Sequence, residues 1–368
     1  MPSIENIRFS RYNVTVAEVD QFLKYLLQAG GSDLHLPVGS PPLIRVHGDL
    51  YLMKGQPLEP QHNLKMAMEI LDEKQQKVLR EHKDLDFSYE IPGVSRFRAN
   101  VYLQRKGLDM VFRAIPARIP PIEELGMPNS VIDFAKQRQG IILVTGPGGC
   151  GKSTTQAALV DYINETREEH VITVEDPIEF LHTDKKCLVN QRQVGSNTKS
   201  FAAALRSALR QDPDVILVGE MRDLETISMA VTAAETGHLV IGTLHTVNAT
   251  QSVDRIIDVF PGDQRSQIRV MVAESIVGVI SQQLVKTADN KGRVAAVEIL
   301  AATTPVRSMI RESKTFQLTS VMQTGRTLGM QLMDEALLKL FQEKKITYQT
   351  ALDRAESKAD FEKAARKS

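Results

Sequence analysis

The sequence is poor in cysteine, with only Cys150 and Cys187, which lie far apart in the chain. A disulfide framework is therefore excluded, and a reducing compartment is expected. Apolar runs are also short: none reaches the roughly 18 residues of a membrane-spanning helix, and the N-terminus has no signal-peptide core. These absences predict a cytoplasmic protein that meets a membrane only through partners.

An excess of charge of one sign is missing too. Lysine plus arginine and aspartate plus glutamate each number 45, so the formal net charge is zero. A broad affinity for nucleic acid is therefore not expected. The sequence also shows no evident strand platform of aromatic and basic side chains of the kind that single-strand binding proteins use. We expect no nucleic-acid partner. The remaining composition, 42% hydrophobic and 24% charged over 368 residues, is typical of a globular protein with two domains.

What the chain does carry is a phosphate loop at residues 141–154, IILVTGPGGCGKST. Apolar residues 141–145 predict a buried strand, and residues 152–163 predict a helix. The glycine-rich turn between them fits the pattern G-x-x-x-x-G-K-[ST]. Amides at such a helix start bind phosphates, the lysine reaches the β- and γ-phosphates, and the hydroxyl joins the shell of Mg²⁺. We expect a nucleotide to bind through Gly146, Gly148, Gly149, Cys150, Gly151, Lys152, Ser153 and Thr154, with Ser153 as a metal ligand.

One residue of this loop suggests a second chemistry. Cys150 lies next to a helix N-terminus and two residues before Lys152. Both neighbours favour a thiolate. The sequence therefore predicts a lowered pKa of the Cys150 thiol and sensitivity to oxidants.

Polar side chains follow three later strands of the expected sheet. Residues 171–174 precede Glu175, Asp176 and Glu179, and residues 215–218 precede Glu220, as in a Walker B segment that places an acid beside Mg²⁺ and the attacking water. His245 follows residues 239–244 and is a candidate for sensing the γ-phosphate or orienting water, a structural histidine being the alternative. Ligands bind at the carboxyl edge of an open α/β sheet. We expect these residues to meet there.

Residues 1–115 predict a smaller α+β unit, with helices at 15–31 and 64–82 and strands within 32–53 and 84–115. Its last strands contain four arginines. They either face solvent on an antiparallel sheet, or some of them reach a nucleotide on a neighbouring domain, as arginine fingers do. Both interpretations stay open for Arg96, Arg98, Arg105 and Arg113. Residues 116–126 contain three prolines and predict a stiff linker to a second domain at 127–368.

Taken together, the motifs resemble one family. The phosphate loop, VEDPIEF, RQDPDVILVGEMRD, ETGHLVIGTLHT and VDRIIDVFP are similar to segments of the secretion-superfamily ATPases. Within these they are most similar to the PilT-type retraction ATPases of type IV pili, in the PilT/PilU branch. SDLHLPVGSPPLIRVHGDL resembles the PAS-like N-terminal domain of that family, and GRVAAVEIL followed by VRSMIRE resembles its C-terminal region, including a short motif linked with retraction.

The resemblance implies an α/β protein in which a RecA-like phosphate-loop ATPase domain follows a PAS-like α+β domain. It implies a cytoplasmic homohexamer at the inner face of the membrane that hydrolyses ATP with Mg²⁺ and powers pilus retraction and twitching motility. The partners would be an inner-membrane pilus platform protein and, as an open question, a paralogous pilus ATPase. Glu220 would be the base for water and Glu179 its helper, both also Mg²⁺ ligands partly through water. His238 and His245 match a histidine box, and Arg98 and Arg113 match charge-supplying strands.

Several alternatives remain. VRSMIRE is not the commonest form of its motif, which leaves an accessory PilU-like ATPase open. Pilus-extension and type II secretion ATPases usually carry an extra N-terminal domain and often a Cys-x-x-Cys zinc insertion, and this sequence shows neither. A nucleic-acid translocase is disfavoured by the zero net charge, and a non-hydrolysing assembly module by the presence of Glu179 and Glu220. Residues 306–312 could form either a core helix or a surface lever.

Overall fold

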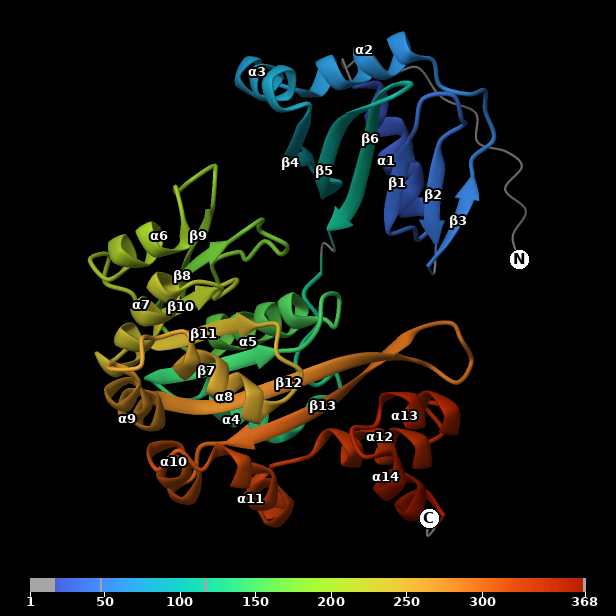
Figure 1. The fold of residues 1–368 in the computed structure, drawn as a ribbon. Coiled ribbons are helices and arrows are strands. Elements are labelled where there is room, and N and C mark those ends of the chain that lie inside the picture. Colours follow the sequence, from blue (N-terminus) through green and yellow to red (C-terminus); the bar gives the residue numbers. More distant parts are fainter. Residues whose placement is uncertain (1–16, 47, 116–117, 367–368) are drawn as a thin grey trace. The chain divides into compact units, whose positions relative to one another are not determined.

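The computed structural model describes residues 17–46, 48–115 and 118–366. The chain divides into two compact units, Met1–Ile115 and Pro116–Ser368 (Figure 1). Of the prolines in the predicted linker, Pro116 lies outside the described residues, whereas Pro120 and Pro121 belong to the second unit. Among the described helices, none combines the length and the apolar character needed to cross a bilayer.

The first unit is built on an antiparallel sheet with the strand order β3-β2-β1-β6-β5-β4. Fully buried Leu34, Phe97 and Phe112 line the face that packs against helices α1, α2 and α3. Alternate residues of the same strands point to the other face, which confirms the α+β character expected of this region. The elements are α1 (Glu18–Gln28), β1 (Asp33–Leu36), β2 (Leu43–Val46), β3 (Asp49–Leu52), α2 (Pro60–Ile70), α3 (Glu73–His82), β4 (Asp84–Ile91), β5 (Ser95–Gln104) and β6 (Gly107–Ile115).

The helix predicted at 64–82 is in fact two helices, α2 and α3. Asp72 caps the second one, because its side chain accepts a hydrogen bond from the amide of Gln75 at 2.8 Å while the Gln75 side chain accepts from the amide of Asp72 at 3.0 Å. This reciprocal cap ends one helix and starts the next.

The second unit is built on a seven-stranded sheet with the order β13-β12-β7-β11-β10-β8-β9. All neighbouring strands run parallel except β12 and β13, which form an antiparallel hairpin. The strands of this sheet and the helices connected to them are α4 (Asn129–Ala135), β7 (Gly140–Thr145), α5 (Lys152–Thr166), β8 (His170–Glu175), β9 (Leu188–Gln193), α6 (Phe201–Ala208), β10 (Val215–Val218), α7 (Leu224–Glu235), β11 (Leu239–Leu244), α8 (Ala249–Asp258), α9 (Arg265–Ser275), β12 (Ile276–Lys286) and β13 (Arg293–Ala301).

Helices cover both faces of this sheet. In β7, Ile141 and Leu143 join a core with helices α6 to α11, whereas Ile142 and Val144 join a separate core with α4 and α5. Adjacent residues of a strand point to opposite faces, so a strand covered on both sides must be apolar throughout. The α/β fold predicted for this region is confirmed.

The C-terminal part of the chain forms short helices. Residues 355–357 separate the last two of them, and there Asp334 accepts hydrogen bonds from the amides of Glu356 and Ser357. Three of these helices form a small core of their own with Val285 and Ala296 of the hairpin. They are drawn in red in Figure 1. The elements are α10 (Thr304–Arg311), the short turns η1 (Thr315–Gln317) and η2 (Arg326–Leu328), α11 (Leu318–Thr324), α12 (Met333–Gln342), α13 (Tyr348–Arg354) and α14 (Lys358–Ala365).

Candidate nucleotide-binding site

Four parallel strands, β7, β11, β10 and β8, are consecutive neighbours in the second sheet, so their carboxyl ends meet at one edge. The phosphate loop follows β7, His245 follows β11, Glu220 follows β10, and the acidic segment begins at the end of β8. Ligands of open α/β sheets bind at this kind of edge. The fold therefore gathers the phosphate loop, His245, Glu220 and the acidic segment on one side of the sheet.

The phosphate loop is shaped by glycine and supported from behind by Gln282 of β12. Gly146 has a φ of 139°, and a Cβ added there would lie 2.3 Å from the carbonyl oxygen of Gln282. Gln282 is 1% exposed, donates Nε2 to the carbonyl of Cys150 at 2.7 Å, and accepts the hydroxyl of Thr155 at 2.9 Å. Gly151, with a φ of 94°, caps α5 in the left-handed conformation. These contacts fix the loop at the start of the helix.

Lys152 lies over this loop. Its Nζ donates to the carbonyl oxygens of Gly146 at 2.9 Å and Pro147 at 3.1 Å. Ser153 and Thr154 follow in the first turn of α5 and are partly exposed, and Gly148 and Gly149 are exposed at the loop tip. The structure thus brings the predicted phosphate-loop residues together around an accessible helix start.

The predicted lowering of the pKa of the Cys150 thiol is wrong, and its sensitivity to oxidants stays a prediction. The side chain is 3% exposed rather than open to solvent. Burial raises the pKa of the Cys150 thiol above its usual value, and the nearby charge of Lys152 only partly offsets this. The local sequence shows the cation and the helix start but not the burial, which is the larger effect here.

Glu220 is held in place by packing around the turn that follows β10. Met221 lies against Gly242, where an added Cβ would come within 2.7 Å of the methionine methyl group. The amide of Met221 donates to the carbonyl of Thr243 at 3.0 Å, and the Thr243 hydroxyl donates to the carbonyl of Gly219 at 2.5 Å. The residues on both sides of Glu220 are therefore tied to the neighbouring strand β11.

The carboxylate of Glu220 contacts two basic side chains. His245 Nε2 lies 2.8 Å from Oε1, and the Arg222 guanidinium bonds the same oxygen. Partial burial raises the pKa of Glu220, but the hydrogen bond and charge of Arg222, followed by those of His245, outweigh it and leave the pKa below its usual value. Glu220 is therefore ionised at neutral pH. Sequence reasoning missed Arg222, whose only signal is its position two residues after the acid.

Within the acidic segment the structure separates two roles. Glu175 is half-buried at the end of β8, where it accepts the Thr173 hydroxyl at 2.6 Å and Gln191 Nε2 at 3.1 Å, and burial of its carboxyl raises the pKa above its usual value. Glu179 is exposed on the loop that continues after the cis peptide bond between Asp176 and Pro177. The predicted helper of Glu220 thus lies on the accessible part of the segment.

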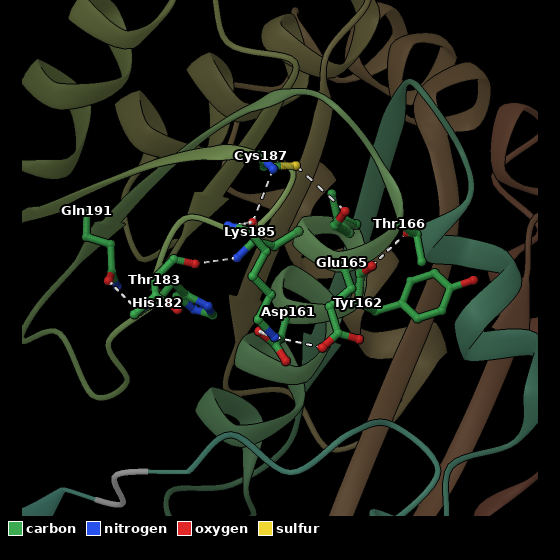
Figure 2. A network of polar contacts seen from close by, with 11 residues as sticks. Asp161, Tyr162, Glu165, Thr166, His182, Thr183, Lys185, Cys187 and Gln191 are labelled. Atoms are coloured by element: carbon green, nitrogen blue, oxygen red, sulfur yellow. Dashed lines mark hydrogen bonds and ion pairs between the residues drawn. The ribbon is translucent and has the colours of Figure 1, made fainter.

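A polar network ties this loop to the phosphate-loop helix (Figure 2). Asn164 of α5 is fully buried, donates Nδ2 to the carbonyl of Thr183 at 2.8 Å, and accepts the amide of Lys185 at 3.1 Å. The ammonium of Lys185 lies 2.8 Å from Asp161 and 2.7 Å from Glu165, both also on α5. Hydrogen bonds and ion pairs therefore hold the acidic loop against the helix that begins with Lys152.

The same network includes a buried histidine. Gln191 donates to the carbonyl of Phe180 at 2.8 Å and accepts the amide of His182 at 2.8 Å. Burial lowers the pKa of the His182 ring to about 4, so the ring is neutral near pH 7. Gln191 also bonds Glu175, and through it the loop is connected to β8 as well as to α5.

The two histidines of the predicted histidine box lie apart in this chain. His245 follows the carboxyl end of β11, whereas His238 precedes its first residue, and six residues of strand span about 20 Å. The ring of His238 bonds the carbonyl of Ala233 at 2.9 Å. Within one chain, His238 is therefore at the opposite edge of the sheet from the phosphate loop.

Arg98 and Arg113 belong to the first unit, where they face each other across β5 and β6. Arg113 Nε donates to Asp33 at 2.7 Å, and Arg98 Nε lies 3.8 Å from Asp86. The Arg113 side chain is 68% exposed although Asp33 is buried. Both guanidinium groups therefore lie on the face of the sheet that the helices of this unit leave uncovered, and their role toward a nucleotide stays a prediction.

The donors at the sheet edge fit Mg²⁺. The hydroxyl of Ser153 and the carboxylate of Glu220 are oxygen ligands, which this hard cation prefers. Among the residues that the structure describes, no group of three or more His, Cys, Asp or Glu could hold a metal ion by itself. Mg²⁺ at nucleotide sites takes most of its ligands from phosphates and water, so such a sparse protein set suits it.

Residues 306–312 form most of helix α10, and their apolar members are core residues. Val306 and Ile310 are both fully buried. Arg307 donates to the carbonyl of Ala273 at 2.7 Å and to that of Glu274, at the end of α9. A cavity of about 540 Å³ beside Arg307 and Gly140 lies at the edge of the sheet opposite the phosphate loop and is separate from the candidate nucleotide site. One side of this helix is therefore packed into the core, whereas Arg311 and Glu312 are exposed, and a role of the segment as a surface lever stays a prediction.

Comparison with known proteins covers nearly the whole chain. Residues 13–368 match the family model "Type II/IV secretion system protein". The type IV pilus retraction ATPase PilT of Pseudomonas aeruginosa is 48% identical over 94% of this chain and 100% of its own length, and the ATPase PilU of the same organism is 38% identical over 94% and 90%. The crystal structure of a PilT motor with bound ADP superposes with a TM-score of 0.88 at 45% identity, covering 93% of this chain and 98% of that one.

The family match, the identity to PilT over the full length of that relative and the agreement of the folds lead to one assignment. The chain belongs to the Type II/IV secretion system protein family and is an ATPase of its PilT branch.

Proposed function

We propose that this protein is a hexameric motor that hydrolyses ATP with Mg²⁺ to power type IV pilus retraction and twitching motility. The observation that carries the proposal is the contact of Glu220 with His245 beside the phosphate loop, in a chain that matches PilT along its entire length. Nucleotide hydrolysis needs an ionised carboxylate, which can accept a proton from water, next to a phosphate-binding loop. This favours an active motor over a non-hydrolysing assembly module.

The catalytic steps follow from the residues at the sheet edge. The amides of residues 146–152 would hold the phosphates, and Lys152 would exchange its contacts with loop carbonyls for the β- and γ-phosphates. When bound, Mg²⁺ would neutralise phosphate charge; Ser153 and, partly through water, Glu220 and Glu179 would hold it. Glu220 would accept the proton of the attacking water, with His245 fixing its orientation and Glu179 assisting.

The remaining charge would come from a neighbouring copy. Arg98 and Arg113 have exposed side chains on the open face of their sheet, and each could supply positive charge to a phosphate in trans, as arginine fingers do. Closure of the interface around the nucleotide would then turn binding energy into motion of the two units. The motor would work on an inner-membrane pilus platform protein, from the cytoplasmic face of that membrane.

The principal retraction ATPase is favoured over the accessory one. Identity to PilT is 48%, against 38% to PilU, and the shares of this chain covered are equal at 94%. A direct test is complementation: the gene should restore twitching to a strain that lacks PilT. Restoration only in a strain that lacks PilU would reverse the assignment.

The first biochemical experiment is steady-state ATP hydrolysis with mass measured in Mg-ATP, for the wild type, Glu220→Gln and the control Glu225→Gln. Glu225 is an exposed residue of α7 paired with Arg206, outside the site. We expect hexamers in all three and loss of turnover by at least about 100-fold in Glu220→Gln alone. A wild type without turnover, or an unaffected Glu220→Gln, would contradict the proposal.

A further inference from the structure

A buried carboxylate, Glu298 of β13, joins the starts of two helices that are far apart in sequence. It is 3% exposed. Its Oε1 accepts the amide of Ala249 at 2.7 Å, and its Oε2 accepts the amide of Met333 at 3.3 Å. These amides belong to the first residues of α8 and α12. One side chain therefore serves both helices.

The α8 end of this connection leads to the nucleotide site. The hydroxyl of Ser252, in the first turn of α8, lies 2.7 Å from that of Thr246 and 3.3 Å from that of Thr145, the last residue before the phosphate loop. His245 immediately precedes Thr246 and contacts Glu220. The start of α8 is thus fixed by the same loop that touches the proposed base.

The α12 end leads to the C-terminal helices, which pack into a core of their own. A weaker second connection runs beside it. Asn248 Nδ2 donates to Glu356 at 3.2 Å, and the amide of Glu356 donates to Asp334 of α12 at 2.7 Å. Glu298 is the direct contact, because among the residues that the structure describes it is the one whose side chain bonds the first amides of both helices.

We propose that Glu298 is a positioning residue that couples the nucleotide site to the C-terminal helices, by holding the start of α8 and the start of α12 to one carboxylate. A displacement of the His245 loop on nucleotide binding then moves α12. This inference rests on the proposed nucleotide site and goes beyond it, since it assigns the route by which the C-terminal helices respond.

The chemistry of the contact requires two equivalent acceptor oxygens. Each helix start carries a partial positive charge, which a carboxylate complements on both sides. A glutamine has one acceptor oxygen and an NH₂ group, so it can serve only one of the two amides. The charged groups that act on Glu298 are Glu356, on the segment before α14, and Asp334, on α12, and both disfavour its ionisation.

Protonation changes this contact near neutral pH. Burial, above all, raises the pKa of Glu298 to about 7, with the two neighbouring carboxylates adding to the effect. The ionised form accepts from both helices. A protonated carboxyl turns one oxygen into a donor and weakens one of the two contacts, so coupling is nearly complete at pH 8, about half lost near pH 7 and weakest below pH 6.

The test is hydrogen–deuterium exchange of the full chain at pH 8, with and without saturating Mg-ADP. In the wild type, the nucleotide should slow exchange at least about threefold in the first turns of both α8 and α12. Glu298→Gln should bind Mg-ADP with a Kd within about threefold of wild type and retain the α8 response, but lose the α12 response. The matched control is Glu335→Gln. Glu335 accepts from Arg326 and from the amide of Leu332 at the start of α12, and the glutamine can keep only one of these contacts. Because α8 is untouched, this variant should keep both responses.

A response of α12 that persists in Glu298→Gln overturns the coupling, as does a wild type in which the phosphate loop responds and α12 does not. Failure of the wild type to bind Mg-ADP would instead overturn the nucleotide site itself. If the glutamine variant does not fold, Glu298→Asp replaces it in the same exchange experiment with the same expected loss of the α12 response, because the shorter side chain keeps the charge but cannot reach both helices.

Kinetics supply an independent readout. The kcat of the wild type should fall about tenfold between pH 8 and pH 6, the size of effect typical of residues that orient a catalytic group. Glu298→Gln should show the low value at both pH values with KM unchanged. A glutamine variant with the wild-type pH profile would overturn the proposal.

Discussion

His245 and Glu220 follow different strands, yet Nε2 of the first lies 2.8 Å from Oε1 of the second. The contact spans the ends of β11 and β10, which are paired in parallel register from Val215 and Leu239 onward. The histidine therefore stands between the phosphate loop, after β7 on one side, and the proposed base on the other. Any change in the loop after β11 reaches Glu220 directly.

Replacing His245 should impair catalysis more than binding. His245→Ala leaves Glu220 with Arg222 as its basic contact, so the carboxylate loses its fixed orientation. We expect kcat to fall about 10- to 100-fold with a nucleotide Kd close to that of wild type. His82→Ala, at an exposed position in the first unit, is the control and should leave both kcat and the nucleotide Kd unchanged. A kcat unchanged in His245→Ala would remove the histidine from the mechanism.

Replacing Lys152 should abolish nucleotide binding. The ammonium lies over the phosphate loop, and Lys152→Ala removes the only charged side chain within residues 146–154. We expect at least about a 100-fold rise in the Kd for a fluorescent ATP analogue. Lys136→Ala removes a surface lysine paired with Asp133 and should bind normally. Equal affinity in the two variants would argue against this loop as the phosphate site.

Substitution of the first loop glycine should destabilise the second unit. In Gly146→Ala the new Cβ would lie 2.3 Å from a backbone oxygen, at a φ of 139°. We expect a loss of about 2 kcal/mol or more, seen as a lower midpoint of thermal unfolding. Gly262→Ala, where nothing lies within 4 Å of the added atom, should change the midpoint little. Similar midpoints for both variants would refute the close approach of β12.

Cys150 should react slowly in the folded protein. Its burial and raised thiol pKa both reduce the thiolate available at pH 8. We expect a disulfide reagent such as DTNB to label it at least about tenfold more slowly in the native protein than in urea. Mass spectrometry of the labelled peptide distinguishes it from Cys187, which is also buried. Rapid labelling that Mg-ADP prevents would restore the idea of an activated thiol.

The raised pKa of Glu298 also predicts how stability depends on pH. The folded protein holds this proton up to about pH 7, whereas the unfolded chain releases it near 4.5. The folded state therefore binds more protons between these values, and stability falls as pH rises through that window. Relative to Glu298→Gln, the wild type should lose roughly 3 kcal/mol between pH 4.5 and 7 and little above it. Urea unfolding of the two proteins at several pH values provides the measurement.

Much of the second unit was predictable because a sheet covered on both faces needs uninterrupted apolar strands. Residues 215–218 and 239–244 read as strands from their composition, and β10 and β11 have these bounds. The phosphate loop could also be recognised from the sequence, since its glycines and Lys152 stand at the fixed positions of the phosphate-loop pattern. The carboxylates and His245 could be assigned to one edge because parallel strands share it.

Contacts that depend on the order of the strands were not predictable. Gln282 supports the phosphate loop only because β12 lies next to β7, and Glu298 joins two helices that begin 84 residues apart, at Ala249 and Met333. The error over Cys150 has a related cause, since burial arises from packing rather than from neighbours in sequence. The helix break at Asp72 was missed because the apolar spacing continues across it.

The support of the phosphate loop by Gln282 also affects the cost of ligand binding. The loop's conformational entropy is lost when the protein folds, because β12 holds the carbonyl of Cys150 and the hydroxyl of Thr155 from behind. An arriving nucleotide then has little backbone left to order, and its affinity is not reduced by that penalty. If the protein is the proposed motor, which would release and rebind nucleotide in every cycle, a loop that keeps its shape between cycles would speed each rebinding step.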